Sequence, residues 1–129
     1  ATLNGVESVH TYDCADAGAA LRKGERYDVV VIDPTALAKS RTQSQKALGR
    51  YQSLNRDAMQ AVEPGGYLVT SSCSHFVDEA AFLEVLKRAA RSIQRPIWIV
   101  EVRGAARDHP VLLAMPETAY LKCVTLRVF

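Results

Sequence analysis

Cysteine is scarce in this sequence, and the three that occur lie far apart. Cys14, Cys73 and Cys123 form no C-x-x-C pair, and no pair of histidines stands beside them at the spacing of metal ligands. This pattern argues against a zinc site and against the disulfide framework of small secreted domains. We therefore expect no bound metal and a reducing cytoplasm as the location of the chain.

An excess of charge is also missing, because 16 Lys and Arg stand against 14 Asp and Glu, for a formal net charge of +2. Such a balance creates no protein-wide field for nucleic acid or an anionic membrane, so any contact of that kind must be local. No apolar run is long enough to cross a membrane, and the first residues do not resemble a signal peptide. We expect a soluble chain with no membrane partner.

What the sequence does contain is an alternation of β-rich runs with amphipathic helical stretches, over 129 residues and without repeats. This pattern predicts strands at 9–12, 27–32, 67–72, 96–102 and 120–129, and helices at 16–24, 42–62 and 78–93. The alternation is typical of one α/β domain with a mainly parallel, doubly wound sheet. The β-branched run from Val29 to Ile32 indicates a central strand covered on both faces.

Polar or reactive groups follow three of these predicted strands. They are Asp16, the pair Asp33-Pro34, and the segment Ser72-Cys73-Ser74. Parallel sheets bind ligands beyond the carboxyl ends of their strands, where such side chains face a crevice. We therefore expect the three positions to share one rim of the sheet.

Each of these residues has a structural as well as a functional interpretation. A free cysteine such as Cys73 is most often a small buried hydrophobe, but beside a helix amino terminus or a protonated neighbour it becomes a nucleophile. His75 is near in sequence, although nothing in the pattern makes it face the thiol. Asp33 either forms a turn before its proline or hydrogen-bonds a heterocyclic base. Asp16 either caps a helix or contacts a cofactor.

Five motifs follow one another along the chain: D-P at 33–34, Y-x-x-L-N-R-D-A at 51–58, E-P-G-G-Y-L-V-T-S-S-C-S-H at 63–75, A-A-R-D-H-P-V at 105–111 and P-E-T-A-Y-L-K at 116–122. In this order and spacing they resemble the bacterial ribosomal RNA large-subunit cytosine-5 methyltransferases. Those are class I S-adenosylmethionine-dependent enzymes with an amino-terminal PUA module. The resemblance spans essentially the whole chain and implies that residues 1–129 are a partial methyltransferase catalytic domain with a Rossmann-like sheet, from the carboxyl-terminal side.

The resemblance also implies a role for each residue of the rim. Cys73 matches the nucleophile that adds to carbon 6 of cytosine and activates carbon 5 toward the sulfonium methyl group. Asp33 matches the acid that holds the edge of the base, and with Pro34 it belongs to the motif against the cofactor. Asp16 matches the acid that accepts a hydrogen bond from the adenine amino group of S-adenosylmethionine. The substrate implied is RNA, with an unpaired or flipped nucleotide.

Two departures from the family pattern stand out. Thr35 replaces the second proline of the D-P-P motif, and the sequence has neither the G-x-G loop nor the acidic residue that ends a second strand. The family sheet has the order 3-2-1-4-5-7-6, so its first two strands would be missing between the 9–12 and 27–32 strands. Because this gap leaves a hydrophobic strand edge open, we expect either another segment or a homodimer to cover it.

Three functional hypotheses remain open. The first is an RNA cytosine-5 methyltransferase, the second is a truncated methyltransferase-like binding domain without turnover, and the third is a methyltransferase for another substrate. Basic residues near the predicted helix 42–62 are candidates for phosphate contacts or simply a solvated face: Lys39, Arg41, Lys46, Arg50 and Arg56.

Overall fold

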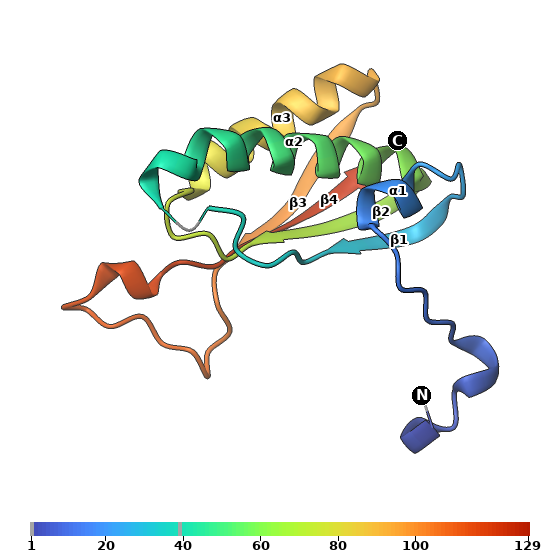
Figure 1. The fold of residues 1–129 in the computed structure, drawn as a ribbon, viewed down its shortest axis with the longest axis horizontal. Coiled ribbons are helices and arrows are strands. Elements are labelled where there is room, and N and C mark those ends of the chain that lie inside the picture. Colours follow the sequence, from blue (N-terminus) through green and yellow to red (C-terminus); the bar gives the residue numbers. More distant parts are fainter. Residues whose placement is uncertain (1, 39) are drawn as a thin grey trace.

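The computed structural model describes residues 2–38 and 40–129, which form one sheet with helices packed on it (Figure 1). The four strands are β1 (Tyr27–Ile32), β2 (Val62–Ser72), β3 (Ile97–Arg103) and β4 (Lys122–Val128). Their order in the sheet is β1-β2-β4-β3. This order equals the 4-5-7-6 half of the sheet expected from the resemblance.

Three of the four strands point in one direction. β1 and β2 are parallel, whereas β4 is antiparallel to both of its neighbours, β2 and β3. The sheet is therefore mixed: three strands share one direction, as predicted, but only the β1–β2 pair is parallel, because β4 is inserted against that direction. Parallel pairing brings the carboxyl ends of β1 and β2 to the same edge, where Asp33 and Cys73 follow.

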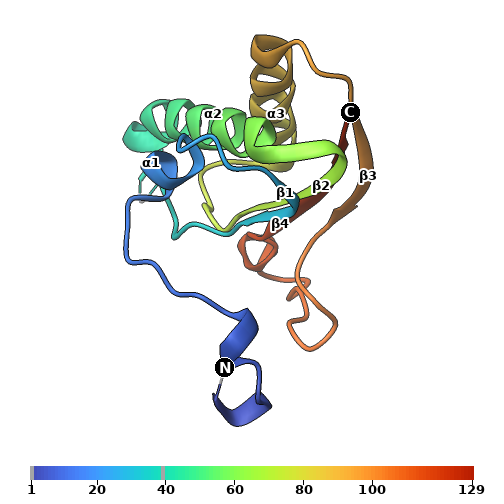
Figure 2. The same ribbon diagram turned by 90° about the vertical axis from the view of Figure 1, so that its right-hand side faces the viewer.

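The helices α1 (Ala17–Leu21), α2 (Ser44–Ala61) and α3 (Glu79–Ile93) all lie on one face of the sheet (Figures 1 and 2). Asp16 and Asp78 cap α1 and α3, because their carboxylates accept hydrogen bonds from the backbone N–H groups of Ala19 and Ala81. Short 3-10 turns lie at Thr2–Asn4, Glu7–Val9, Arg41–Gln43 and Pro116–Thr118.

The core lies between this helical layer and the sheet. Tyr51 and Met59 of α2, Phe82 of α3 and Leu68 of β2 have no exposed surface. The rings of Tyr51 and Phe82 meet edge to face at 5.5 Å, which joins α2 to α3. These contacts hold α2 against α3 and against the face of the sheet.

The opposite face of the sheet is free of helices in the described residues. Val29 and Val31 of β1 are 56% and 65% exposed, and Trp98 of β3 is 63% exposed. The prediction that Val29 to Ile32 is covered on both faces is therefore wrong for this chain, since only Val30 and Ile32 face the helices. We call Val29, Val31, Tyr67, Val69 and Trp98 the open face.

The predicted strand at 9–12 is also wrong. Residues Glu7–Val9 form a 3-10 turn, and the segment before α1 leaves the body of the molecule without a strand to pair with (Figure 1). Val9 and Tyr12 are 82% and 84% exposed. A lone β-rich run gains no ladder hydrogen bonds, so its propensity alone does not make a strand.

In the described part of the chain, no helix has both the length and the apolar character needed to cross a membrane.

Candidate functional site

The loops after β1 and β2 meet at one rim, and hydrogen bonds join them. Ser71 Oγ donates to Asp33 Oδ1 at 2.5 Å, and the thiol of Cys73 lies 3.8 Å from the carbonyl oxygen of Pro34. Asp33 is exposed and Cys73 is half-buried. The other carboxylate oxygen of Asp33 has no donor among the described residues, so it remains accessible to a ligand.

Buried hydroxyl groups hold the backbone on both sides of Cys73. Ser72 Oγ donates to Tyr51 Oη at 3.0 Å, and Tyr51 Oη is 2.9 Å from Ser74 Oγ. Ser74 Oγ also accepts from the backbone N–H of Ala38 at 3.2 Å. The segment with the thiol is thus tied both to α2 and to the loop that follows Asp33.

Lys122, the first residue of β4, lies buried beside this segment. Its ammonium donates to the carbonyl oxygens of Ser74 and Tyr120, each at 2.7 Å. Burial lowers the pKa of Lys122, while the negative charges of Cys73 and Asp78 act in the opposite direction. A cationic group therefore lies within electrostatic reach of the thiol.

Cys123, the next residue of β4, is a different kind of thiol. Burial raises its pKa, and the nearby carboxylate of Asp33 adds to this effect. The thiol form is thereby favoured, which makes Cys123 a poor nucleophile.

A cavity of about 630 Å³ lies between α1, α2 and the loop after β1. Asp16, Pro34 and Thr35 are among the residues that line it, so two of the predicted cofactor residues share one hollow. Asp33 lies next in sequence to Pro34 but is not part of this lining. The helix-capping role of Asp16 uses only its Oδ1 atom.

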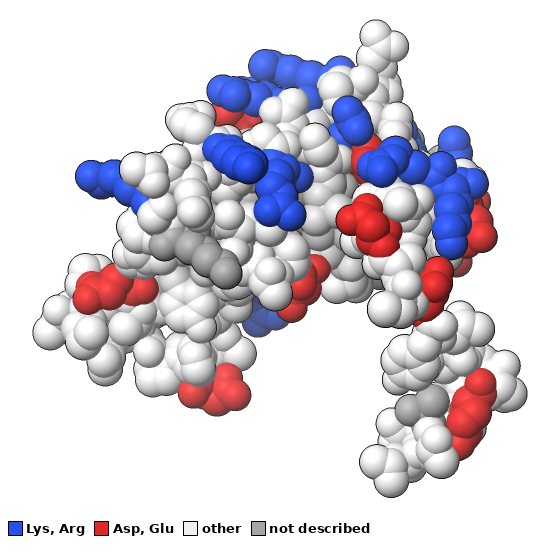
Figure 3. Space-filling view, viewed as in Figure 1, with Lys and Arg blue, Asp and Glu red and all other residues white. Residues whose placement is uncertain are grey.

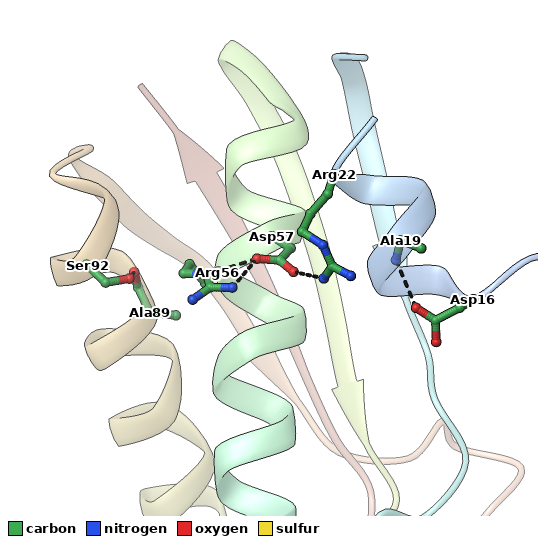
Figure 4. Close-up of polar contacts among 7 residues, drawn as sticks. All are labelled: Asp16, Ala19, Arg22, Arg56, Asp57, Ala89 and Ser92. Atoms are coloured by element: carbon green, nitrogen blue, oxygen red, sulfur yellow. Dashed lines mark hydrogen bonds and ion pairs between the residues drawn. The ribbon is translucent and has the colours of Figure 1, made fainter. Parts of the chain in front are cut away.

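A buried carboxylate fixes α1 beside this cavity. Asp57 of α2 is 2% exposed, and it accepts hydrogen bonds from Arg22 at 2.7 Å and from Arg56 at 2.6 Å (Figure 4). Arg22 directly follows α1, so the pair links α1 to α2 and sets the place of Asp16. The sequence pattern gave no sign of this link.

Basic side chains gather over the helical layer (Figure 3). Lys46 and Arg50 line the same cavity as Asp16, whereas Arg56 is engaged by Asp57. Arg41 lines a separate hollow of about 560 Å³ with His75 and Phe76. Lys39, the fifth basic residue of the predicted cluster, lies outside the described residues.

His75 is exposed, and no hydrogen bond joins it to Cys73 in the part of the chain that the structure describes. Its ring instead meets the ring of Phe76 edge to face at 5.3 Å. Over residues 2–38 and 40–129, no three His, Cys, Asp or Glu side chains are grouped so as to hold a metal ion.

The sheet order, the reversed β4 and the helical layer define the Rossmann-like fold of class I methyltransferases. Solved structures share this fold. One is SMU.776, described as a putative methyltransferase complexed with SAH, with a TM-score of 0.68 and 19% identity; the match covers 87% of this chain and 29% of the SMU.776 chain. Another is TrmN from Thermus thermophilus, with a TM-score of 0.59 and 18% identity; the match covers 99% of this chain and 31% of the TrmN chain. At these identities the likeness concerns the fold.

Sequence similarity points to one group of curated proteins. The chain is 37% identical over 132 residues to "Ribosomal RNA large subunit methyltransferase I" of Shewanella denitrificans, which covers 98% of this chain and 33% of the relative. The protein of the same name from Vibrio cholerae is 41% identical over 106 residues, covering 82% and 27%. The chain thus spans about a third of the length of the curated relatives it matches. No family model matches the sequence.

Proposed function

We propose that this chain is part of the catalytic domain of an S-adenosylmethionine-dependent RNA methyltransferase that modifies carbon 5 of a cytosine in ribosomal RNA. The observation that carries the proposal is the joined rim, where the loop of Asp33 and the segment of Cys73 are held together by hydrogen bonds. The names of the relatives support ribosomal RNA as the substrate.

Cys73 is the proposed nucleophile. Its thiolate forms a bond to carbon 6 of cytosine, and the electron pair of the 5,6 double bond moves into the ring and makes carbon 5 nucleophilic. Asp33 holds the edge of the base by accepting a hydrogen bond through its accessible oxygen, and its negative charge stabilises the positive charge of a protonated ring nitrogen, which makes carbon 6 more electrophilic. After methylation, loss of the carbon-5 proton to a base returns the electron pair to the ring and expels the Cys73 thiolate.

The cavity beside α1 fits one end of the cofactor. Asp16 has a carboxylate oxygen beyond the one that caps α1, and this oxygen can accept a hydrogen bond from the adenine amino group. Pro34 and Leu37 give the same cavity apolar surface for a ring. S-adenosylmethionine supplies the methyl group when bound. Lys46 and Arg50, which also line this cavity, are candidates for contacts with RNA phosphates.

A non-catalytic binding domain is the second candidate. Thr35 in place of the second motif proline favours it, because this residue lines the cavity that the cofactor would occupy. The third hypothesis, a methyltransferase with another substrate, is distinguished by the trapping experiment below. A homodimer through the open sheet edge and a cytoplasmic location stay predictions.

Calorimetric titration of S-adenosylhomocysteine into the 129-residue chain tests the cofactor site. We expect saturable binding that is weakened at least tenfold in Asp16→Ser, since serine still caps α1 but lacks the second carboxylate oxygen. Asp13→Ser, an exposed change outside the cavity, is the matched control. If a folded chain shows no binding, either the strands missing from this chain are indispensable for the cofactor site or the non-catalytic alternative holds.

Trapping with an RNA that contains 5-fluorocytosine tests the nucleophile. Fluorine replaces the proton that must leave carbon 5, so the covalent adduct persists on a denaturing gel in the presence of S-adenosylmethionine. We expect the adduct in the wild type and in Cys123→Ala, and none in Cys73→Ala. An adduct that persists in Cys73→Ala would remove Cys73 from the mechanism.

A further inference from the structure

Lys122 interrupts an apolar pattern at the rim. Val124, Leu126 and Val128 of β4 face the helices in strict alternation, and Lys122 continues this face with only 5% of its surface exposed. A buried ammonium costs free energy unless it is compensated, and burial indeed lowers the pKa of Lys122. An apolar residue would fill the same place without this cost, so the buried charge indicates a functional role for Lys122.

The contacts of Lys122 lead to Cys73. One of its two hydrogen bonds goes to the carbonyl oxygen of Ser74, the residue that directly follows the thiol. The other goes to the carbonyl oxygen of Tyr120, so the segment after Cys73 is fixed to the start of β4. Cys73 and Asp78 are the two groups whose negative charges favour the ammonium form of Lys122.

This attraction is mutual. An ammonium and a thiolate that lie close together stabilise each other by the same energy. The thiolate, not the thiol, is the reactive form of cysteine. Asp78 is exposed and already accepts from the backbone N–H of Ala81, so it shares its charge with the start of α3.

We propose that Lys122 is a positioning residue for Cys73, which orients the thiol through the Ser74 carbonyl group and stabilises its thiolate by charge. This inference rests on the proposed function, in which Cys73 is the nucleophile. Its test, however, needs neither RNA nor cofactor, so the role of Lys122 can be decided even if the chain transfers no methyl group.

The rate at which iodoacetamide alkylates each cysteine, measured at pH 8 by mass spectrometry, tests the proposal on the 129-residue chain. Lys122→Met keeps an unbranched side chain that is one atom shorter and removes the charge, whereas Lys122→Arg keeps the charge. Cys14 is exposed and lies before α1, so it reports the intrinsic rate. Cys123, half-buried in β4, reports whether the sheet has loosened.

We expect Lys122→Met to slow alkylation of Cys73 about tenfold relative to Cys14, and Lys122→Arg to stay within about threefold of the wild type. If Lys122 only stabilises the fold, we expect the alkylation rate to change in the opposite direction in Lys122→Met, because a loosened fold exposes Cys73 and Cys123 and speeds both reactions. An unchanged or faster rate at Cys73 in Lys122→Met would therefore overturn the proposal. An equal loss in Lys122→Arg would overturn the role of the charge.

Discussion

Single hydroxyl groups set the geometry of the proposed site at the scale of residues. The Tyr51 hydroxyl contacts the serines on both sides of Cys73, while its ring fills the core between α2 and α3. The sequence predicted Tyr51 as an apolar position of a helix, and helical periodicity holds no information about where a hydroxyl points. The rim positions of Asp33 and Cys73 were predictable, because they follow from strand ends alone.

Replacing Tyr51 by phenylalanine separates these two contributions. The ring and its packing remain, but the hydroxyls of Ser72 and Ser74 lose a buried partner, so we expect the free energy of unfolding to fall by about 1–2 kcal/mol. Urea unfolding followed by circular dichroism measures this change. Tyr12→Phe, at an exposed position, should leave stability within about 0.5 kcal/mol. Equal stability of Tyr51→Phe and the wild type would show that the hydroxyl contacts are not stabilising.

At the scale of elements, the segment Pro64-Gly65-Gly66 shows how backbone chemistry shapes the start of a strand. Sequence reasoning placed a turn there and began the strand at Tyr67, whereas β2 begins at Val62 and includes all three residues. The pairing with β1 shifts between Tyr27 and Val29, and Gly65 adopts a positive φ of 88°. The segment is thus an irregularity inside a strand, which Gly65 permits and which a turn signal alone does not distinguish from a loop.

A side chain at Gly66 would clash with its neighbours, whereas a Cβ atom at Gly65 would meet nothing within 4 Å. A Cβ atom there would lie 2.6 Å from the carbonyl oxygen of Asp28 and 2.9 Å from Val62 Cγ1. We therefore expect Gly66→Ala to lower the free energy of unfolding by about 2–3 kcal/mol, because β1 and β2 must move apart.

Gly49→Ala is the matched control, since Gly49 lies in α2 and a Cβ atom there meets nothing within 4 Å. It should raise the free energy of unfolding by about 0.5–1 kcal/mol through helix propensity. Urea unfolding of both variants measures the two effects. A stable Gly66→Ala would mean that the two strands are not held as closely as the structure has them.

At the scale of the whole molecule, one face and one edge of the sheet are left uncovered. Sequence reasoning anticipated the open edge of β1, because the missing strands follow from the resemblance to a known sheet order. It did not anticipate that one face of the sheet would also lack covering helices, since the run Val29 to Ile32 is apolar at every position. Such a run predicts burial on both faces, and only the helical face is covered in the described residues.

An exposed edge strand with an apolar face favours pairing with another chain. β1 combines both features, because Val29 and Val31 are exposed and, among the described residues, β1 is paired along one edge only, with β2. We expect the apparent mass in light scattering to rise with concentration from 14.1 kDa toward twice that value. A lysine on such a strand opposes pairing, so Val31→Lys should hold the mass at that of one chain.

The control for this last experiment is Val111→Lys, which adds the same charge at a valine that is 52% exposed in the loop between β3 and β4. It should associate like the wild type, because the loop offers no strand edge. Both variants should unfold within about 0.5 kcal/mol of the wild type, since the changes are on the surface. A wild-type chain that keeps the mass of a monomer at every concentration, or a Val31→Lys variant that still associates, would rule out pairing through β1 as the contact between copies.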